Sequence, residues 1–215
     1  MTKQIQHVCE FYAITHKLKN TMREGWKIWR VDAQRFESVA EHVYGTQMLA
    51  MAICCEFDLG LDMTKIALML AVHEIGESII GDIPITGCPY TKEQKQKIEM
   101  EAVTKILGGI SNSEKLKDLF IEFEERKTPE ARFAYFIDKL ECGLQCKFYE
   151  ETGCNDLNKE LPQACKEEIQ PYLDEGITTL SGKWLTNYIR NIFPQDEVFK
   201  GIAEYALENK IFKTE

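Results

Sequence analysis

The fold class of this chain follows from residues 64–75, which read TKIALMLAVHEI. Apolar side chains would cover almost the whole circumference of a helix formed by this stretch, as expected for a helix in the middle of a bundle. Thr64 can cap its N-terminus, and Gly81 and Pro84 are expected to stop it. We therefore predict a central, buried helix that carries a histidine and a glutamate next to each other.

Apolar residues also recur at helical spacing on both sides of this stretch. No segment shows sustained period-two alternation between hairpin turns, so we predict an all-α protein. Ser38 is expected to be an N-cap that forms a capping box with Glu41, and residues 25–31 are expected to be a connector. The further helices are expected at residues 5–19 (with an apolar stripe of Ile5, Val8, Phe11, Tyr12 and Leu18), 38–60, 92–107, 113–125, 128 onward, 163–193 with a break near Gly176, and 196–210.

The length and composition suit a single packed domain. With 215 residues, 44% of them hydrophobic and 28% charged, we expect one domain over residues 1–215. Its core should span about residues 26–150, and residues 151–215 should add C-terminal helices that pack on the core or form a dimer interface. The apolar residues that suggest such an interface, and with it a homodimer, are Ile177, Leu180, Trp184, Leu185, Tyr188, Ile189 and Phe193.

Charge and targeting signals narrow the choice of partners. The net charge of −9 argues against binding a long nucleic acid, which depends on neutralising many phosphates, but it permits a small anionic substrate at a metal ion. The N-terminus lacks the apolar run of a signal peptide, and no apolar stretch approaches the roughly 20 residues of a membrane span. We therefore expect a cytoplasmic protein without membrane contacts, whose eight cysteines are reduced.

Two of the four histidines, His42 and His73, lie inside apolar helical patterns. A buried imidazole must satisfy its ring nitrogens, and a divalent cation can satisfy both His73 and the adjacent Glu74. Asp138 also lies in the apolar part of a helix, where an unpaired charge would be costly. The alternative is that both histidines bind backbone carbonyls and that Asp138 pairs with Lys139 or an arginine.

Three stretches of the chain resemble the HD-domain phosphohydrolases, and within them the 5'-deoxynucleotidase group. They are residues 34–42, 71–84, which read AVHEIGESIIGDIP, and 128–145. The resemblance implies an HD-domain helical bundle, a dimer, and hydrolysis of (deoxy)nucleoside 5'-monophosphates to nucleoside and phosphate. It also implies that one divalent cation is held by His42, His73, Glu74 and Asp138.

This mixed set of nitrogen and oxygen ligands suits a transition metal, namely Mn, Co, Fe, Ni or Zn, better than Ca, and Mg is possible. The chain departs from the family at position 74, where Glu replaces the family's Asp. The extra methylene lengthens the reach of the carboxylate by roughly 1.5 Å. Metal identity, metal affinity and activity therefore depend on how the site accommodates Glu74.

The same resemblance assigns roles to four further residues. Glu77 would protonate the departing sugar oxygen or orient the attacking water, and Asp82 would bind a sugar hydroxyl or share the proton transfer. Arg35 would bind the phosphate, and Trp26 would crowd the sugar. The alternatives are a solvated carboxylate for Glu77 and aromatic packing under a connector for Trp26.

Three other functions remain open on the sequence alone. The same metal core could serve a phosphodiesterase or a pyrophosphohydrolase that acts on another nucleotide, because a fold does not fix the substrate. Glu74 could instead mark an impaired site that binds a nucleotide or a metal as a sensor. A purely structural helical protein would hold no metal at all.

Overall fold

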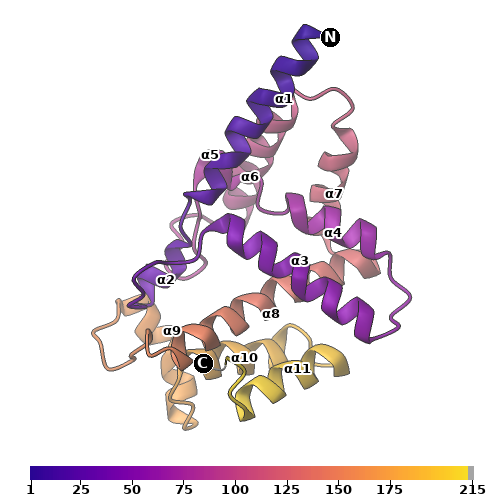
Figure 1. The fold of residues 1–215 in the computed structure, drawn as a ribbon. Coiled ribbons are helices and arrows are strands. Elements are labelled where there is room, and N and C mark those ends of the chain that lie inside the picture. The colour runs from indigo at the N-terminus through magenta and orange to yellow at the C-terminus, as the bar shows by residue number, and fades with distance from the viewer. Residues whose placement is uncertain (213–215) are drawn as a thin grey trace. The chain divides into compact units, whose positions relative to one another are not determined.

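The computed structural model describes residues 1–212 and is built from helices (Figure 1). Apart from one isolated antiparallel bridge between Met22 and Ser38, the described residues form no β-structure. The prediction of an all-α protein is therefore confirmed. The helices are α1 (Thr2–Thr15), the 3₁₀ helix η1 (His16–Lys19), α2 (Glu24–Ile28), α3 (Val39–Glu56), α4 (Met63–Val72), α5 (Glu77–Ile80), α6 (Lys92–Leu107), α7 (Glu114–Glu125), α8 (Pro129–Glu151), α9 (Gln163–Asp174), α10 (Leu180–Asn191) and α11 (Glu197–Glu208).

The chain divides into two compact units, and each contains separate segments of the sequence. Unit 1 consists of Met1–Arg23, Glu37–Pro84 and Cys88–Tyr135. Unit 2 consists of Glu24–Phe36, Ile85–Gly87 and the chain from Phe136 onward. Helix α8 is continuous and has residues in both units. Whether residues 1–215 fold as a single domain stays a prediction.

Unit 1 places α3 beside α4, as Figure 1 shows. The predicted start of α3 is confirmed, because Ser38 and Glu41 form a reciprocal capping box. The predicted cap of α4 is wrong by two residues. Asp62, not Thr64, is the N-cap, since its carboxylate accepts a hydrogen bond from the backbone N–H of Lys65 at 3.0 Å.

The central helix is shorter than the sequence pattern predicts. Helix α4 ends at Val72, and a turn over residues 73–76 separates it from the short α5. Within this turn the N–H of Glu77 donates to the carbonyl of Glu74 at 3.1 Å, which is the i→i−3 pattern of a 3₁₀ turn. The helix therefore tightens where the two predicted metal ligands lie.

The N-terminal helix differs from its predicted stripe. Leu18 is buried, and Phe11 packs against the apolar cluster around Val72, but Ile5, Val8 and Tyr12 are exposed. The periodicity identified the helix correctly. It could not show that only the end of the helix near η1 is covered by the rest of unit 1.

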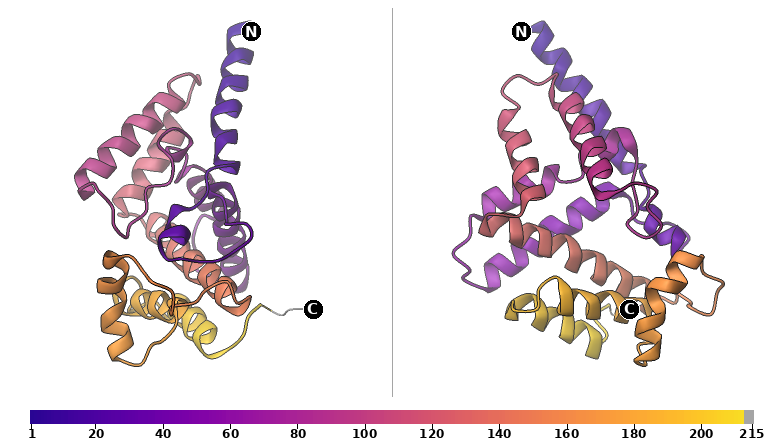
Figure 2. Two further views of the ribbon diagram at one scale, coloured as in Figure 1. Left: turned by 90° about the vertical axis from the view of Figure 1, so that its left-hand side faces the viewer. Right: turned by 180° about the vertical axis from the view of Figure 1, so that it is seen from behind.

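Unit 2 contains a cluster of aromatic, aliphatic and thiol side chains. Residues 25–31, which we predicted as a connector, contain most of α2, and Trp26 in this helix and Trp29 directly after it are buried in the cluster. Helices α10 and α11 lie side by side, as both views in Figure 2 show. Gly176, at φ 83°, makes the predicted break between α9 and α10.

The apolar face from which we predicted a dimer interface is partly buried. Leu180, Leu185, Tyr188 and Phe193 are buried, and the Phe193 ring packs against Phe199 of α11 at 5.6 Å between centroids. Ile177, Trp184 and Ile189 are half-buried. Whether this face forms a dimer interface stays a prediction.

Two further predictions concern the state of the cysteines and the presence of membrane-spanning helices. All eight cysteines lie among the described residues and are free thiols. In the part of the chain that the structure describes, no helix combines the length and apolarity that a bilayer span requires.

Candidate metal centre and catalytic site

The first imidazole of the predicted site lies on α3. The capping box at Ser38 fixes the start of this helix, and the N–H of His42 donates to the Ser38 carbonyl at 3.1 Å, so His42 lies one turn into the helix. Its side chain is completely buried. The ring centroids of His42 and His73 lie 5.5 Å apart, which brings α3 and the end of α4 together at the two histidines.

The second imidazole, His73, is held by its own helix. Its Nδ1–H donates a hydrogen bond to the carbonyl of Leu70 at 2.7 Å. In a neutral imidazole with its hydrogen on Nδ1, Nε2 carries no hydrogen, and its lone pair can bind a metal ion. Histidines that bind a metal through one ring nitrogen commonly donate the N–H of the other nitrogen to a carbonyl, which fixes the orientation of the ring. The alternative that we left open, a histidine bonded to a carbonyl, is thus compatible with a metal ligand.

Glu74 lies within reach of the same imidazole. Its Oε1 is 3.7 Å from Nε2 of His73 and 3.7 Å from Nη1 of Arg23. Arg23 is not among the residues predicted from the sequence. The antiparallel bridge between Met22 and Ser38 and the hydrogen bond from the Arg23 N–H to the Glu37 carbonyl at 3.1 Å bring it there.

Asp138 on α8 is the fourth member of the predicted set. His42, His73 and Glu74, all in unit 1, each offer one ligand atom, and these three atoms lie within 4.8 Å of one another. Asp138 belongs to unit 2, and its place in the set stays a prediction. The Asp138 carboxylate also forms an ion pair with Lys139, with 2.8 Å between Oδ2 and Nζ, as the alternative proposed. A carboxylate has two oxygens and can serve a lysine and a cation together.

This group fits a divalent transition metal. Ligand atoms at about 2.0–2.3 Å from one cation lie roughly 3–4.5 Å from one another, which agrees with the 3.7 Å between His73 and Glu74. The set combines two imidazole nitrogens with two carboxylate oxygens, and the histidines and Asp138 are buried. The donor types of these four residues, three of which unit 1 brings together, therefore suit one ion of the kind that we predicted.

Glu77 is a buried carboxyl group next to this set. Only 5% of it is exposed, and its Oε2 has no hydrogen-bond partner among the described residues. Residues three apart align in a 3₁₀ turn, so Glu77 lies near Glu74. Burial, and next the charges of Glu74 and Asp82, raise the pKa of Glu77 well above its usual range, although Arg23 and Lys95 oppose this. The solvated carboxylate that we considered as an alternative is not what the structure contains.

Asp82 lies in the loop that follows α5. Gly81 adopts φ 76° and ends the helix, and its N–H still donates to the Glu77 carbonyl at 2.9 Å. The charge of Asp82 acts on the pKa of Glu77, so the two carboxylates are neighbours in unit 1.

The two predicted substrate-binding residues both belong to unit 2. Trp26 is buried against Tyr149, at 5.2 Å between ring centroids, and next to Trp184. It therefore packs in the aromatic cluster, as the alternative proposed. Arg35 is exposed. Their roles in binding substrate stay predictions.

Glu99 on α6 adds a further carboxyl group to unit 1, and it gives a prediction about stability. Burial raises its pKa to about 7, against the opposing charge of Lys95. The folded protein therefore holds a proton that the unfolded chain releases above its ordinary pKa of 4.5. The free energy of unfolding should accordingly fall as the pH rises from 4.5 to 7.

We expect Glu99→Gln to be more stable than the wild type at pH 8 by about 1 kcal/mol. The difference should shrink as the pH falls toward 5, because the wild-type carboxyl becomes protonated. Urea unfolding between pH 5 and 8 measures this, and the exposed Glu101→Gln on the same helix is the control. A difference that does not change with pH would contradict the assignment.

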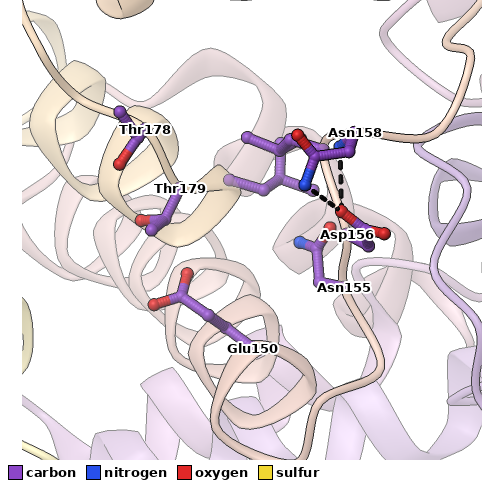
Figure 3. Close-up of a pocket in the computed structure, with 8 residues that line it drawn as sticks. Glu150, Asn155, Asp156, Asn158, Thr178 and Thr179 are labelled. Carbon is purple, nitrogen blue, oxygen red and sulfur yellow. Dashed lines mark hydrogen bonds between the residues drawn. The ribbon is translucent and has the colours of Figure 1, made fainter.

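A separate polar pocket of about 340 Å³ lies in unit 2 (Figure 3). Its lining includes the carboxylates of Glu150 and Asp156, and Asp156 accepts hydrogen bonds from the backbone N–H and the side-chain amide of Asn158 at 2.9 and 2.8 Å. Carboxylates repel a phosphate unless a cation lies between them, and this lining includes no histidine, lysine or arginine that could hold a metal ion or a phosphate. This pocket is therefore a poorer candidate for a phosphate site than the group around His73.

Comparisons with known proteins identify the family of this chain. Residues 15–180 match the family described as HD domain. The 5'-deoxynucleotidase HDDC2 of Dictyostelium discoideum is 35% identical over 152 residues, which are 66% of this chain and 77% of that protein. The 5'-deoxynucleotidase hdd1 of Schizosaccharomyces pombe is 33% identical over 163 residues, 71% of this chain and 78% of that protein.

Solved structures share the fold as well. A conserved hypothetical protein from Pyrococcus furiosus matches with a TM-score of 0.60 and 29% identity over 79% of this chain and 96% of that chain. A predicted metal-dependent phosphohydrolase from Magnetospirillum magnetotacticum matches with a TM-score of 0.67 over 96% of this chain and 94% of that chain. Its identity of 22% supports the fold alone.

Proposed function

This chain belongs to the HD-domain family and is a nucleotide phosphohydrolase, and on that premise we propose that it hydrolyses deoxynucleoside 5'-monophosphates to nucleoside and phosphate. The observation that carries the proposal is that the two imidazoles and the Glu74 carboxylate offer ligand atoms within 4.8 Å of one another in unit 1. We propose that Asp138 completes this set. The names of its relatives, which are 5'-deoxynucleotidases, support the choice of substrate.

An HD domain implies a divalent metal, and His42, His73, Glu74 and Asp138 are the residues that would hold it. We propose Mn, Co, Fe, Ni or Zn, with Mg possible, because the ligand set is mixed. When bound, such an ion supplies a water of lowered pKa and polarises a phosphoryl oxygen.

Side chains of the protein must transfer the proton that ends on the sugar 5'-oxygen. Hydrolysis forms a bond from the water oxygen to phosphorus, breaks the bond from phosphorus to the sugar 5'-oxygen, and leaves a proton on that oxygen. We propose that Glu77 delivers this proton or orients the water, because it is buried beside Glu74 with one oxygen that no described residue binds. Asp82 is proposed to bind a sugar hydroxyl or to share the proton transfer.

Three further residues are proposed to contact the substrate. Arg23 presents a guanidinium group 3.7 Å from Glu74, and such a group can bind phosphate in bidentate fashion. Arg35 and Trp26 keep the phosphate-binding and sugar-crowding roles that the family resemblance suggests.

A phosphate-release assay tests this function. The purified protein is given deoxy- and ribonucleoside 5'-monophosphates, with Mn, Co, Mg and Zn compared. Release of phosphate with preference for the deoxy substrates supports the proposal. Turnover of a phosphodiester or a nucleoside triphosphate instead of monophosphates would favour the alternative phosphodiesterase or pyrophosphohydrolase. Nucleotide binding without turnover would favour a sensor.

The substitution Glu74→Asp tests the one departure from the family. We expect activity equal to or higher than that of the wild type, because the shorter carboxylate is the family's own choice at this position. The measurement is kcat with each metal at saturating substrate. A complete loss of activity would show that the site is built around the longer side chain.

We further propose that the protein acts in the cytoplasm, as a homodimer, on small nucleotides rather than on nucleic acids. The eight free thiols and the net charge of −9 support a reducing compartment and a small substrate, respectively. The dimer rests on the family resemblance.

A further inference from the structure

Lys95 on α6 connects two elements of unit 1. Its Nζ donates a hydrogen bond to the carbonyl oxygen of Ile83 at 3.2 Å. The same ammonium group lies 3.5 Å from Oε1 of Glu99, one turn further along α6. Lys95 is therefore a tether between α6 and the loop that follows α5.

The tethered carbonyl belongs to the residue directly after Asp82. Gly81 ends α5 at φ 76°, and residues 81–84 continue as irregular backbone. Such a segment lacks the regular hydrogen bonds that hold a helix, so a donor from a neighbouring helix restricts its position. By fixing the Ile83 carbonyl, Lys95 limits where the Asp82 carboxylate can lie.

The charge of Lys95 and the charge of Asp82, which directly precedes the tethered Ile83, both affect the pKa of Glu77. Asp82 raises the pKa of the Glu77 carboxyl and Lys95 lowers it, so both charges lie within electrostatic range of that group. The loop that Lys95 holds is therefore adjacent to the carboxyl group that we place at the reacting phosphate.

We propose that Lys95 is a positioning residue for the hydrolysis, which holds Asp82 beside Glu77 through the Ile83 carbonyl. The proposal rests on the proposed function, because it assigns Lys95 a task in that reaction. Lys95 acts through the loop and does not itself contact the substrate.

The first test compares Lys95→Met with Lys97→Met. Lys97 lies on the same helix, is 78% exposed at its side chain, and pairs only loosely with Glu101 at 3.9 Å, so it is a matched control. We expect Lys95→Met to lower kcat about tenfold to a hundredfold, with bound metal and melting temperature unchanged. Lys95→Arg should restore most of the rate, because a guanidinium can also donate to a carbonyl. Wild-type kcat in Lys95→Met would overturn the proposal.

A double-mutant cycle with Asp82→Asn separates positioning from a general structural effect. If Lys95 acts through Asp82, Lys95→Met should cause no further loss of kcat once Asp82 is changed. Losses that multiply in the double variant would show that Lys95 acts independently of Asp82, and would overturn the proposal.

Hydrogen exchange tests the tether without any substrate. Backbone amides in residues 81–90 should exchange faster in Lys95→Met than in Lys97→Met. Unchanged exchange would overturn the tether even in an active enzyme. If the wild type hydrolyses no nucleotide, the proposed function fails, and faster exchange in Lys95→Met would still support the tether.

Discussion

Replacing His73 with alanine is expected to remove the bound divalent cation and to abolish turnover. His73 is the proposed ligand whose orientation is fixed most clearly, because its Nδ1–H donates to the Leu70 carbonyl and its Nε2 lies 3.7 Å from Oε1 of Glu74. A metal ion stabilises the transition state by several kcal/mol, so its loss should lower kcat by about 10³-fold or more. Metal content by elemental analysis and phosphate release measure the two effects.

The matched control is His16→Ala, because His16 is exposed on η1 and its ring meets the Tyr12 ring edge-on at 5.7 Å between centroids. This variant should keep both metal and activity. Since His73 is buried, His73→Gln is measured beside the alanine variant, and the helical circular dichroism of both shows whether the fold survives. A folded His73→Ala protein that retains metal and rate would contradict the site.

The second large effect is expected for Glu77→Gln, which keeps the shape of the side chain but cannot exchange a proton. A general acid or base contributes about 10²–10⁴-fold to the rate, so kcat should fall by that amount. The metal should stay bound, because Glu77 is not one of the four residues that we propose as its ligands. Loss of rate with retained metal would separate Glu77 from His73.

The exposed Glu101→Gln on α6 is the control for a change of one charge. It should leave kcat unchanged. If Glu77→Gln hydrolysed the substrate at the wild-type rate, the role of Glu77 in proton transfer would be wrong. If it lost the metal as well, Glu77 would be part of the metal centre.

Much of the candidate site could be predicted because its residues are polar where the surrounding helical pattern is apolar. His42, His73 and Asp138 are polar groups in apolar helical patterns, and such positions need a partner. The capping box at Ser38 and Glu41 was equally visible, because it is a short-range pattern with one geometry.

Other features could not be predicted because they depend on tertiary packing. Residues 64–80 show a continuous helical pattern, yet the backbone tightens after Val72, and periodicity does not distinguish a short 3₁₀ turn from an α-helix. Arg23 reaches Glu74 only because Met22 pairs with Ser38, which lies 16 positions further along the chain. The exposed side of α1 likewise depends on which part of the helix its neighbours cover.

The central claim is that His42, His73, Glu74 and Asp138 bind one divalent cation. Anomalous diffraction from crystals of the Mn- or Zn-loaded protein tests it most directly. We predict one strong peak within about 2.0–2.3 Å of an atom from each of the four side chains. A peak bound by other residues, or no peak near His73 in crystals that contain stoichiometric metal, would contradict the account.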